Sequence, residues 1–167
     1  MAIATATTRI RVTEDTSVFP PSPILQLFAA ALDAFAEFIA RERDLVGVDA
    51  WDPAFRGWLA DAETAQDRLS DLQHALLAAP LLLPADRPLK LAAYVLQATL
   101  GAERPEEVAH LHRVAREKTS FFRLQPSSAA NRRVNRMLVR GLRLYEDFLT
   151  LDLVGHGDED AELSPSL

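Results

Sequence analysis

Five arginines near the C-terminal end of the chain are the residues whose type and spacing most clearly suggest chemistry. A helix advances by about 100° per residue, so all five would fall within an arc of roughly 100° if this segment is helical. Each planar guanidinium group can form paired hydrogen bonds with a carboxylate or a phosphate. The candidate partner-binding or anion-binding residues are therefore Arg132, Arg133, Arg136, Arg140 and Arg143.

Three interpretations of this arginine face stay open at the level of sequence. It could be a solvated helix face on which Asp147 pairs with Arg143 at i,i+4 spacing. It could be a docking surface for an acidic partner protein or a neighbouring subunit, or it could bind nucleic acid or another polyanion. The sequence pI of about 5.2 and the absence of a recognised nucleic-acid-binding motif argue against nucleic acid.

The charge of the whole chain is unevenly distributed. Residues 1–103 carry a net charge of −6, residues 104–143 carry +7 and residues 144–167 carry −7, so the total of −6 conceals a basic block. A basic block of this kind attracts an acidic partner, and the acidic end of the chain could itself fold back on it.

Two acid–histidine pairs have the spacing of metal ligands, but their placement argues against a metal centre. Glu107 and His110 match the Glu-x-x-His spacing of carboxylate-bridged helical bundles, and Asp71 and His74 have the same spacing. The second pair falls on the polar side of its helix, and the first falls at the edge of the apolar stripe. We therefore expect no metal site, although a metal-binding helical-bundle enzyme stays as the second alternative.

No other feature indicates catalysis or a bound cofactor. The chain has no cysteine, which excludes disulfides and thiolate chemistry, and its 6 glycines form no phosphate-binding loop or nucleophile elbow. The apolar stretch Ile24–Ala40 is interrupted by charges and is short for a membrane span. We expect a cytoplasmic protein without cofactor, catalytic residues or membrane partner.

The elements that position these residues are predicted to be helices. Ser22-Pro23 and Asp52-Pro53 each have the pattern of an N-cap followed by proline in the first turn. Apolar residues recur at helical spacing after both pairs. We expect five helices, which begin at Pro23, at Asp52-Pro53, after Asp86, at Pro105 and at Ser127 or Ser128, the last running to about Val154.

The pattern predicts an all-α fold, a single helical-bundle domain over residues 22–154. Residues 1–21 form a predicted extended arm with strand-like alternation, and residues 155–167 form a predicted mobile acidic tail. The apolar face of the first helix is too wide for one neighbour, so that helix is central or faces another chain. We expect Trp51 and Trp58 to be core or interface anchors, and the Leu81–Leu83 run to pack against the rest of the protein.

These observations lead to one leading hypothesis and two alternatives. The leading hypothesis is a non-catalytic interaction or regulatory protein that binds a protein partner or forms a homo-oligomer. A module that binds nucleic acid or another polyanion through the basic face is the first alternative, and the metal-binding bundle is the second.

Overall fold

The computed structural model describes residues 21–49 and 51–155, and within these residues it contains helices and no strand. The prediction of an all-α fold is therefore confirmed. The predicted arm and tail lie outside the described residues except for Pro21 and Gly155. The helices are α1 (Pro23–Leu45), α2 (Phe55–Ala78), α3 (Asp86–Leu100), α4 (Pro105–Glu117), α5 (Thr119–Phe122) and α6 (Ala129–Gly155).

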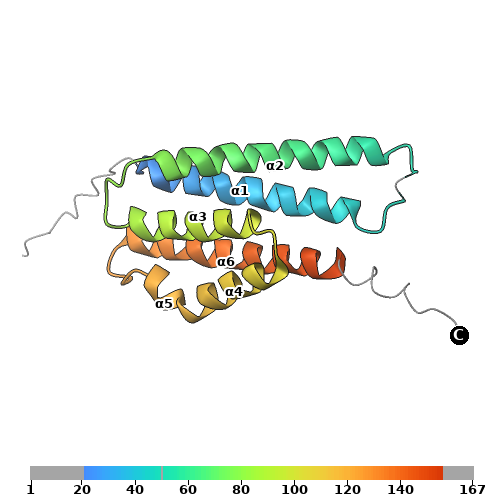
Figure 1. Ribbon diagram of the computed structural model, residues 1–167. Helices are drawn as coiled ribbons and strands as arrows, with labels where there is room; N and C mark the ends of the chain where they lie inside the picture. The colour runs from blue at the N-terminus through green and yellow to red at the C-terminus, as the bar shows by residue number, and fades with distance from the viewer. Residues whose placement is uncertain (1–20, 50, 156–167) are drawn as a thin grey trace, which may run out of the picture.

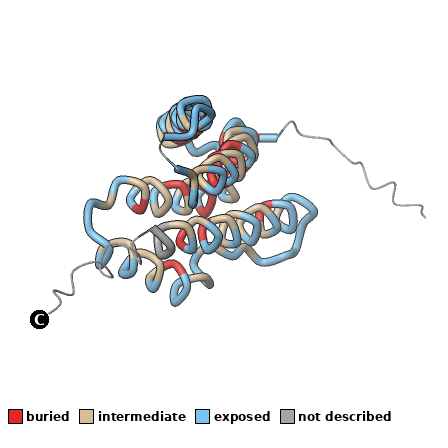
Figure 2. Tube along the Cα trace, turned by 90° about the vertical axis from the view of Figure 1, so that its right-hand side faces the viewer, coloured by how far each residue is buried: buried red, intermediate tan, exposed pale blue. Residues whose placement is uncertain are grey.

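Helix α1 lies at the centre of the bundle. It packs against α2 as an antiparallel hairpin, and its other sides meet α3 and α6, while α4 and α5 lie on the outside of α3 (Figure 1). Buried residues gather where these helices face one another (Figure 2). The wide apolar face of α1 is explained by this central position, because its buried residues are Ile24, Phe28, Ala31, Leu32, Ala34, Phe35, Phe38 and Ile39.

Helix α1 is long enough and apolar enough to cross a membrane. Of the 18-residue apolar stretch within it, 44% is buried inside the bundle. The central helix of a bundle meets the same criteria, because burial against other helices requires the same apolar side chains as burial in lipid.

Two clusters of buried side chains form the core along the length of α1. One cluster joins Ile24 and Phe28 to Leu76, Leu89 and Val134 at the end of the bundle where α1 begins. The other surrounds Phe35 and Phe38, whose rings lie 5.8 and 6.1 Å from that of Phe148 on α6. Because α1 contributes to both, it connects the two ends of the molecule.

A buried polar contact joins the starts of α1 and α3. Ser22 caps α1 as expected, since its Oγ accepts a hydrogen bond from the Leu25 N–H at 3.1 Å. The same hydroxyl donates to Oδ1 of Asp86, a residue that is 1% exposed. The Oδ2 atom accepts from the N–H groups of Leu82 and Leu83. The carboxylate of Asp86 therefore holds the α2–α3 connection against the first turn of α1.

Two predicted helix boundaries are wrong. Helix α2 begins at Phe55 rather than at Pro53, because Asp52 forms a turn in which its Oδ1 accepts from the Ala54 N–H. The helix predicted from Pro105 ends at Glu117 and is followed by the separate short helix α5. At this break the Thr119 hydroxyl donates to backbone carbonyls of α4. A threonine hydroxyl that competes for backbone partners in this way disfavours a continuous helix.

The structure also corrects the expected burial of two groups of apolar residues. Trp51 is 91% exposed and precedes α2, so it does not share a helical face with Trp58, which is 38% exposed. Neither tryptophan belongs to the core. The Leu81–Leu83 run does not pack against the bundle, because its three side chains are 51–61% exposed.

Candidate anion-binding recess and apolar cavity

The five predicted arginines all lie on the exposed side of α6. The opposite side of this helix carries Val134, Tyr145 and Leu149, which are buried against the rest of the bundle. The amphipathic pattern of the segment therefore produces the arrangement that the helical wheel predicts: packing on one side and guanidinium groups on the other.

Three of these arginines surround a recess of about 610 Å³ in the surface. Its walls also include Arg123, which follows α5 and was not among the predicted site residues. Arg132 and Arg133 do not line it. The full set of lining residues is Arg123, Asn135, Arg136, Val139, Arg140 and Arg143.

The arginines of α6 differ in their partners. Nη1 of Arg140 lies 2.7 Å from Oδ1 of Asp33 on α1, and Nη1 of Arg132 donates to the Pro126 carbonyl at 3.2 Å. Among the described residues no ion pair involves Arg136 or Arg143, so the sequence-based pairing of Arg143 with Asp147 is not present there. Arg123 likewise forms no ion pair among the described residues, so Arg123, Arg136 and Arg143 are the lining residues best able to meet an added anion.

Asn135 holds Arg123 at the rim of the recess. Its Oδ1 accepts from the Leu124 N–H at 2.9 Å, and its Nδ2 donates to the Leu124 carbonyl at 2.8 Å. This pair of hydrogen bonds attaches the segment after α5 to α6. Asparagine suits the position because one side chain offers both the acceptor and the donor.

Replacing Asn135 with alanine should lower the free energy of unfolding by about 1–2 kcal/mol, because both backbone groups of Leu124 lose their partner. Urea denaturation followed by circular dichroism measures this loss. Asn131→Ala is the comparison, since Asn131 bonds exposed groups and its removal should cost less. Equal losses in the two variants would contradict the role of Asn135.

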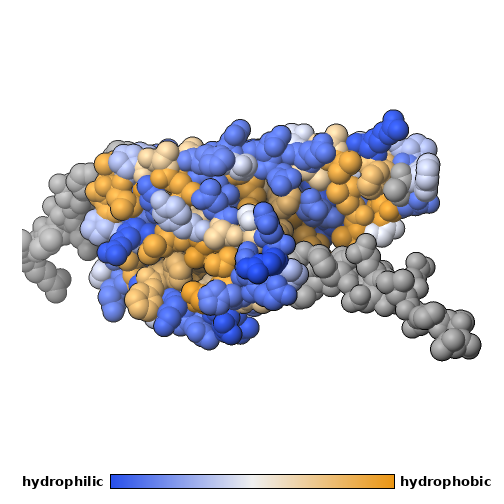
Figure 3. Space-filling view, in the orientation of Figure 1, coloured by the Kyte–Doolittle hydropathy of each residue, from blue (hydrophilic) through white to orange (hydrophobic). Residues whose placement is uncertain are grey.

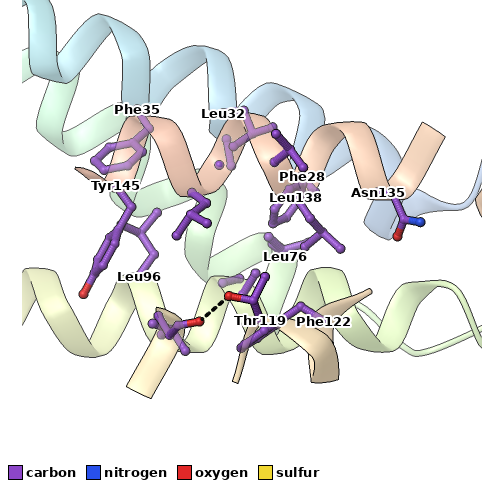
Figure 4. Close-up of a pocket in the computed structure, with 18 of the residues that line it drawn as sticks. Phe28, Leu32, Phe35, Leu76, Leu96, Thr119, Phe122, Asn135, Leu138 and Tyr145 are labelled. Carbon is purple, nitrogen blue, oxygen red and sulfur yellow. Dashed lines mark hydrogen bonds between the residues drawn. The ribbon is translucent and has the colours of Figure 1, made fainter. Parts of the chain in front are cut away.

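An apolar cavity of about 110 Å³ adjoins the recess and is lined by residues from all six described helices, α1 to α6. Figure 4 shows Phe28, Leu32, Phe35, Leu76 and Leu138 around it, with Thr119 and Phe122 of α5 on one side. Three residues line both the cavity and the recess: Arg123, Asn135 and Val139. The two spaces therefore adjoin, and one is mainly apolar while the other is lined mostly by arginines.

One polar side chain in the cavity wall is unsatisfied. Gln73 on α2 is 5% exposed, and its amide nitrogen has no hydrogen-bond partner among the described residues. A buried amide without a partner costs free energy that a suitable ligand can recover. Gln73 lies on the same helical face as Leu69 and Leu76, which is a sequence signal for its burial, but it was not among the predicted site residues.

Tyr145 supplies the other buried polar group of the wall. Its hydroxyl lies 2.8 Å from Oγ1 of Thr99, and this threonine hydroxyl also lies 2.9 Å from the Val95 carbonyl, to which it donates. The tyrosine is therefore the donor to Thr99. Burial raises the pKa of Tyr145. Tyr145 is a neutral, positioned part of the wall.

The acid–histidine pairs of the sequence are not brought together. Glu107 pairs with Arg104, and Nδ1 of His110 lies 3.0 Å from Nη2 of Arg113. Asp71 and His74 are exposed on α2. In the described ranges no three potential metal ligands lie close enough to hold an ion.

Comparisons with protein-family models, with curated proteins and with solved structures give no match. Functional conclusions therefore depend on the chemistry of the recess and the cavity.

Proposed function

We propose that the protein binds a small amphipathic anion, with its apolar part in the cavity and its carboxylate or phosphate on the arginines of the recess. The observation that carries this proposal is that the two spaces adjoin and share Arg123, Asn135 and Val139. A ligand with one apolar and one anionic end would satisfy both at once, as ligand sites with an apolar lining and a few polar groups do.

The cavity limits the size of the apolar part. An engineered apolar cavity of about 150 Å³ accepts benzene, and sites for drug-sized ligands begin at about 300 Å³. The volume here is about 110 Å³. The apolar part of the ligand is therefore a single ring or a short chain. Gln73, whose amide nitrogen has no hydrogen-bond partner among the described residues, is a polar residue of the cavity wall.

The recess favours an anionic over a neutral head group. Arg136 and Arg143 can each offer a charge-assisted hydrogen bond, and such bonds are about twice as strong as those between neutral groups. The attraction is local, because the chain as a whole carries a net charge of −6. Binding should weaken as salt concentration rises.

The hypothesis of a non-catalytic interaction or regulatory protein stays a prediction. Binding of a small anion is compatible with it, because regulatory proteins respond to small ligands. Self-association also stays a prediction, but its support changes. The wide face of α1 is buried within the chain, so exposed residues such as Trp51 are now the reason to expect a homo-oligomer.

Titration with octanoate and with phenylacetate, followed by calorimetry, tests the proposal. We expect saturable binding of at least one of these carboxylates. The variant Ala92→Leu places a larger side chain in the cavity wall, so affinity should fall at least about tenfold while thermal stability is kept or raised. Absence of saturable binding, or full affinity in Ala92→Leu, would overturn the proposal.

The arginines provide a matched control on one helix. Arg136→Gln combined with Arg143→Gln should lower affinity about tenfold to a hundredfold, because charge-assisted bonds are lost. Arg133→Gln removes a charge from α6 outside the recess and should leave affinity nearly unchanged. An equal effect of Arg133→Gln would show a general charge effect and exclude the recess as the site.

A further inference from the structure

The connection between α2 and α3 presents three leucines to solvent in a fixed conformation. Leu81, Leu82 and Leu83 are 53%, 61% and 51% exposed. They lie between Pro80 and Pro84, which restrict the backbone on both sides. Apolar surface is visible at this end of the molecule, where α2 passes into the connection (Figure 3). Single apolar residues scattered over a protein surface are normal, but three adjacent exposed leucines form a contiguous apolar patch, and such patches indicate an interaction site.

Four polar backbone groups in or beside this connection have hydrogen-bond partners within the protein. The N–H groups of Leu82 and Leu83 donate to Asp86 Oδ2 at 3.1 and 2.8 Å, and the Leu83 carbonyl accepts from the Asp86 N–H. Nζ of Lys90 donates to the Ala79 carbonyl at 2.6 Å. The leucine side chains can therefore move from water into lipid while these backbone groups keep their hydrogen-bond partners. Lipid requires this, because it offers no hydrogen bonds to backbone groups.

The charge around the leucines has one sign. Segments 24–32, 76–93 and 124–144 supply the core cluster at this end of the bundle, and their only acidic residue is Asp86, which is buried. Several basic residues lie in the same segments beside the shared core cluster of Ile24, Leu76, Leu89 and Val134. They include Arg87, Lys90, Arg132 and Arg133.

We propose that this end of the protein docks on an anionic lipid surface, with Leu81–Leu83 inserted among the acyl chains and the surrounding basic residues on the head groups. Peripheral proteins bind such surfaces by combining apolar insertion with attraction to anionic lipids. A nucleic acid would use the same positive charge, but it offers no medium for three leucine side chains. The sequence-based expectation was of no membrane partner, and this proposal replaces it with binding to a lipid surface.

Co-sedimentation with vesicles tests this inference on the full chain. We expect binding to vesicles of phosphatidylglycerol and phosphatidylcholine, and much weaker binding to phosphatidylcholine alone. Leu82→Gln combined with Leu83→Gln keeps the backbone N–H groups and should lower vesicle affinity at least about tenfold. Circular dichroism should show an unchanged fold, because both side chains are exposed.

The opposite end of the α1–α2 hairpin supplies a matched control. Val46 and Trp51 are 51% and 91% exposed, so Val46→Gln combined with Trp51→Gln removes comparable apolar surface far from the leucines. This variant should keep its affinity for the vesicles. Equal affinity of the Leu82→Gln, Leu83→Gln variant and the parent protein would overturn the inference, as would equal loss in the control variant.

Charge variants separate lipid from nucleic acid. Arg87→Gln combined with Arg132→Gln should weaken vesicle binding by about fivefold per charge. Binding of a DNA or RNA duplex with affinity that the leucine substitutions leave unchanged, without binding to anionic vesicles, would assign the surface to nucleic acid and overturn the proposal.

This inference uses residues outside the cavity, so its failure can be distinguished from failure of the proposed function. The leucine variant should still bind octanoate or phenylacetate, and Ala92→Leu should still bind vesicles. Loss of both properties in either variant would contradict the assignment of two separate sites.

Discussion

Replacement of Phe35 by alanine is expected to lower the free energy of unfolding by about 3–5 kcal/mol, the range for truncating a buried phenylalanine. Phe35 is 1% exposed, its ring lies 5.8 Å from that of Phe148, and it lines the cavity. Because Phe35 lines an existing cavity, the neighbouring side chains cannot move far enough to fill the additional space that the removed ring leaves. The cost should therefore lie toward the upper part of this range, and chemical denaturation measures it.

Phe121→Ala is the matched control, because it makes the same chemical change at a side chain that is 75% exposed. Its effect should remain within about 0.5 kcal/mol, as for most surface substitutions. If the two variants were equally stable, the packing of α1 against α6 would not be the main source of stability at Phe35.

Replacement of Asp86 by alanine is expected to cost about 3 kcal/mol. The carboxylate is buried and accepts hydrogen bonds from the Ser22 hydroxyl and from the N–H groups of Leu82 and Leu83. Its removal leaves three donors without a partner, and unsatisfied buried donors each cost about 1–3 kcal/mol. Partial access of water to the two N–H groups keeps the total near the stated value. Thermal and urea denaturation would measure the loss.

Two further variants define the origin of the effect. Ser22→Ala removes a single partner of Asp86 and the cap of α1, so its cost should be about 1 kcal/mol. Asp71→Ala removes an exposed carboxylate from α2 and should be nearly neutral. A loss in Asp86→Ala no larger than in Asp71→Ala would exclude the carboxylate as the clamp between α1 and α3.

The sequence was sufficient to predict the helices and the exposed side of α6. Ser22 and Pro23 carry local signals for the start of α1, and the spacing of the α6 arginines against Val134 and Tyr145 follows from helix geometry. Such features depend on neighbours within a few positions along the chain. They can be predicted without knowledge of tertiary structure.

The cavity and the leucine connection could not be predicted in the same way. The cavity is formed by residues from six helices, so its position depends on how those helices pack. The exposure of Leu82 depends on Asp86, which holds the backbone while the side chain faces solvent. Composition alone favoured packing of Leu82 against the rest of the protein and allowed Trp51 to be a core residue, and tertiary structure corrects both expectations.

Helix α4 has a consequence for the exchange of a bound molecule. Its only buried residue is Ala115, which also lines the cavity, and the adjoining helix α5 buries none of its residues. A segment with so little buried apolar surface separates from its neighbours at lower free energy than α1 or α2. Affinity for the proposed ligand and the lifetime of its complex then depend on different helices. The arginines of α6 determine how strongly the anion is held, and the attachment of α4 determines how often it can leave.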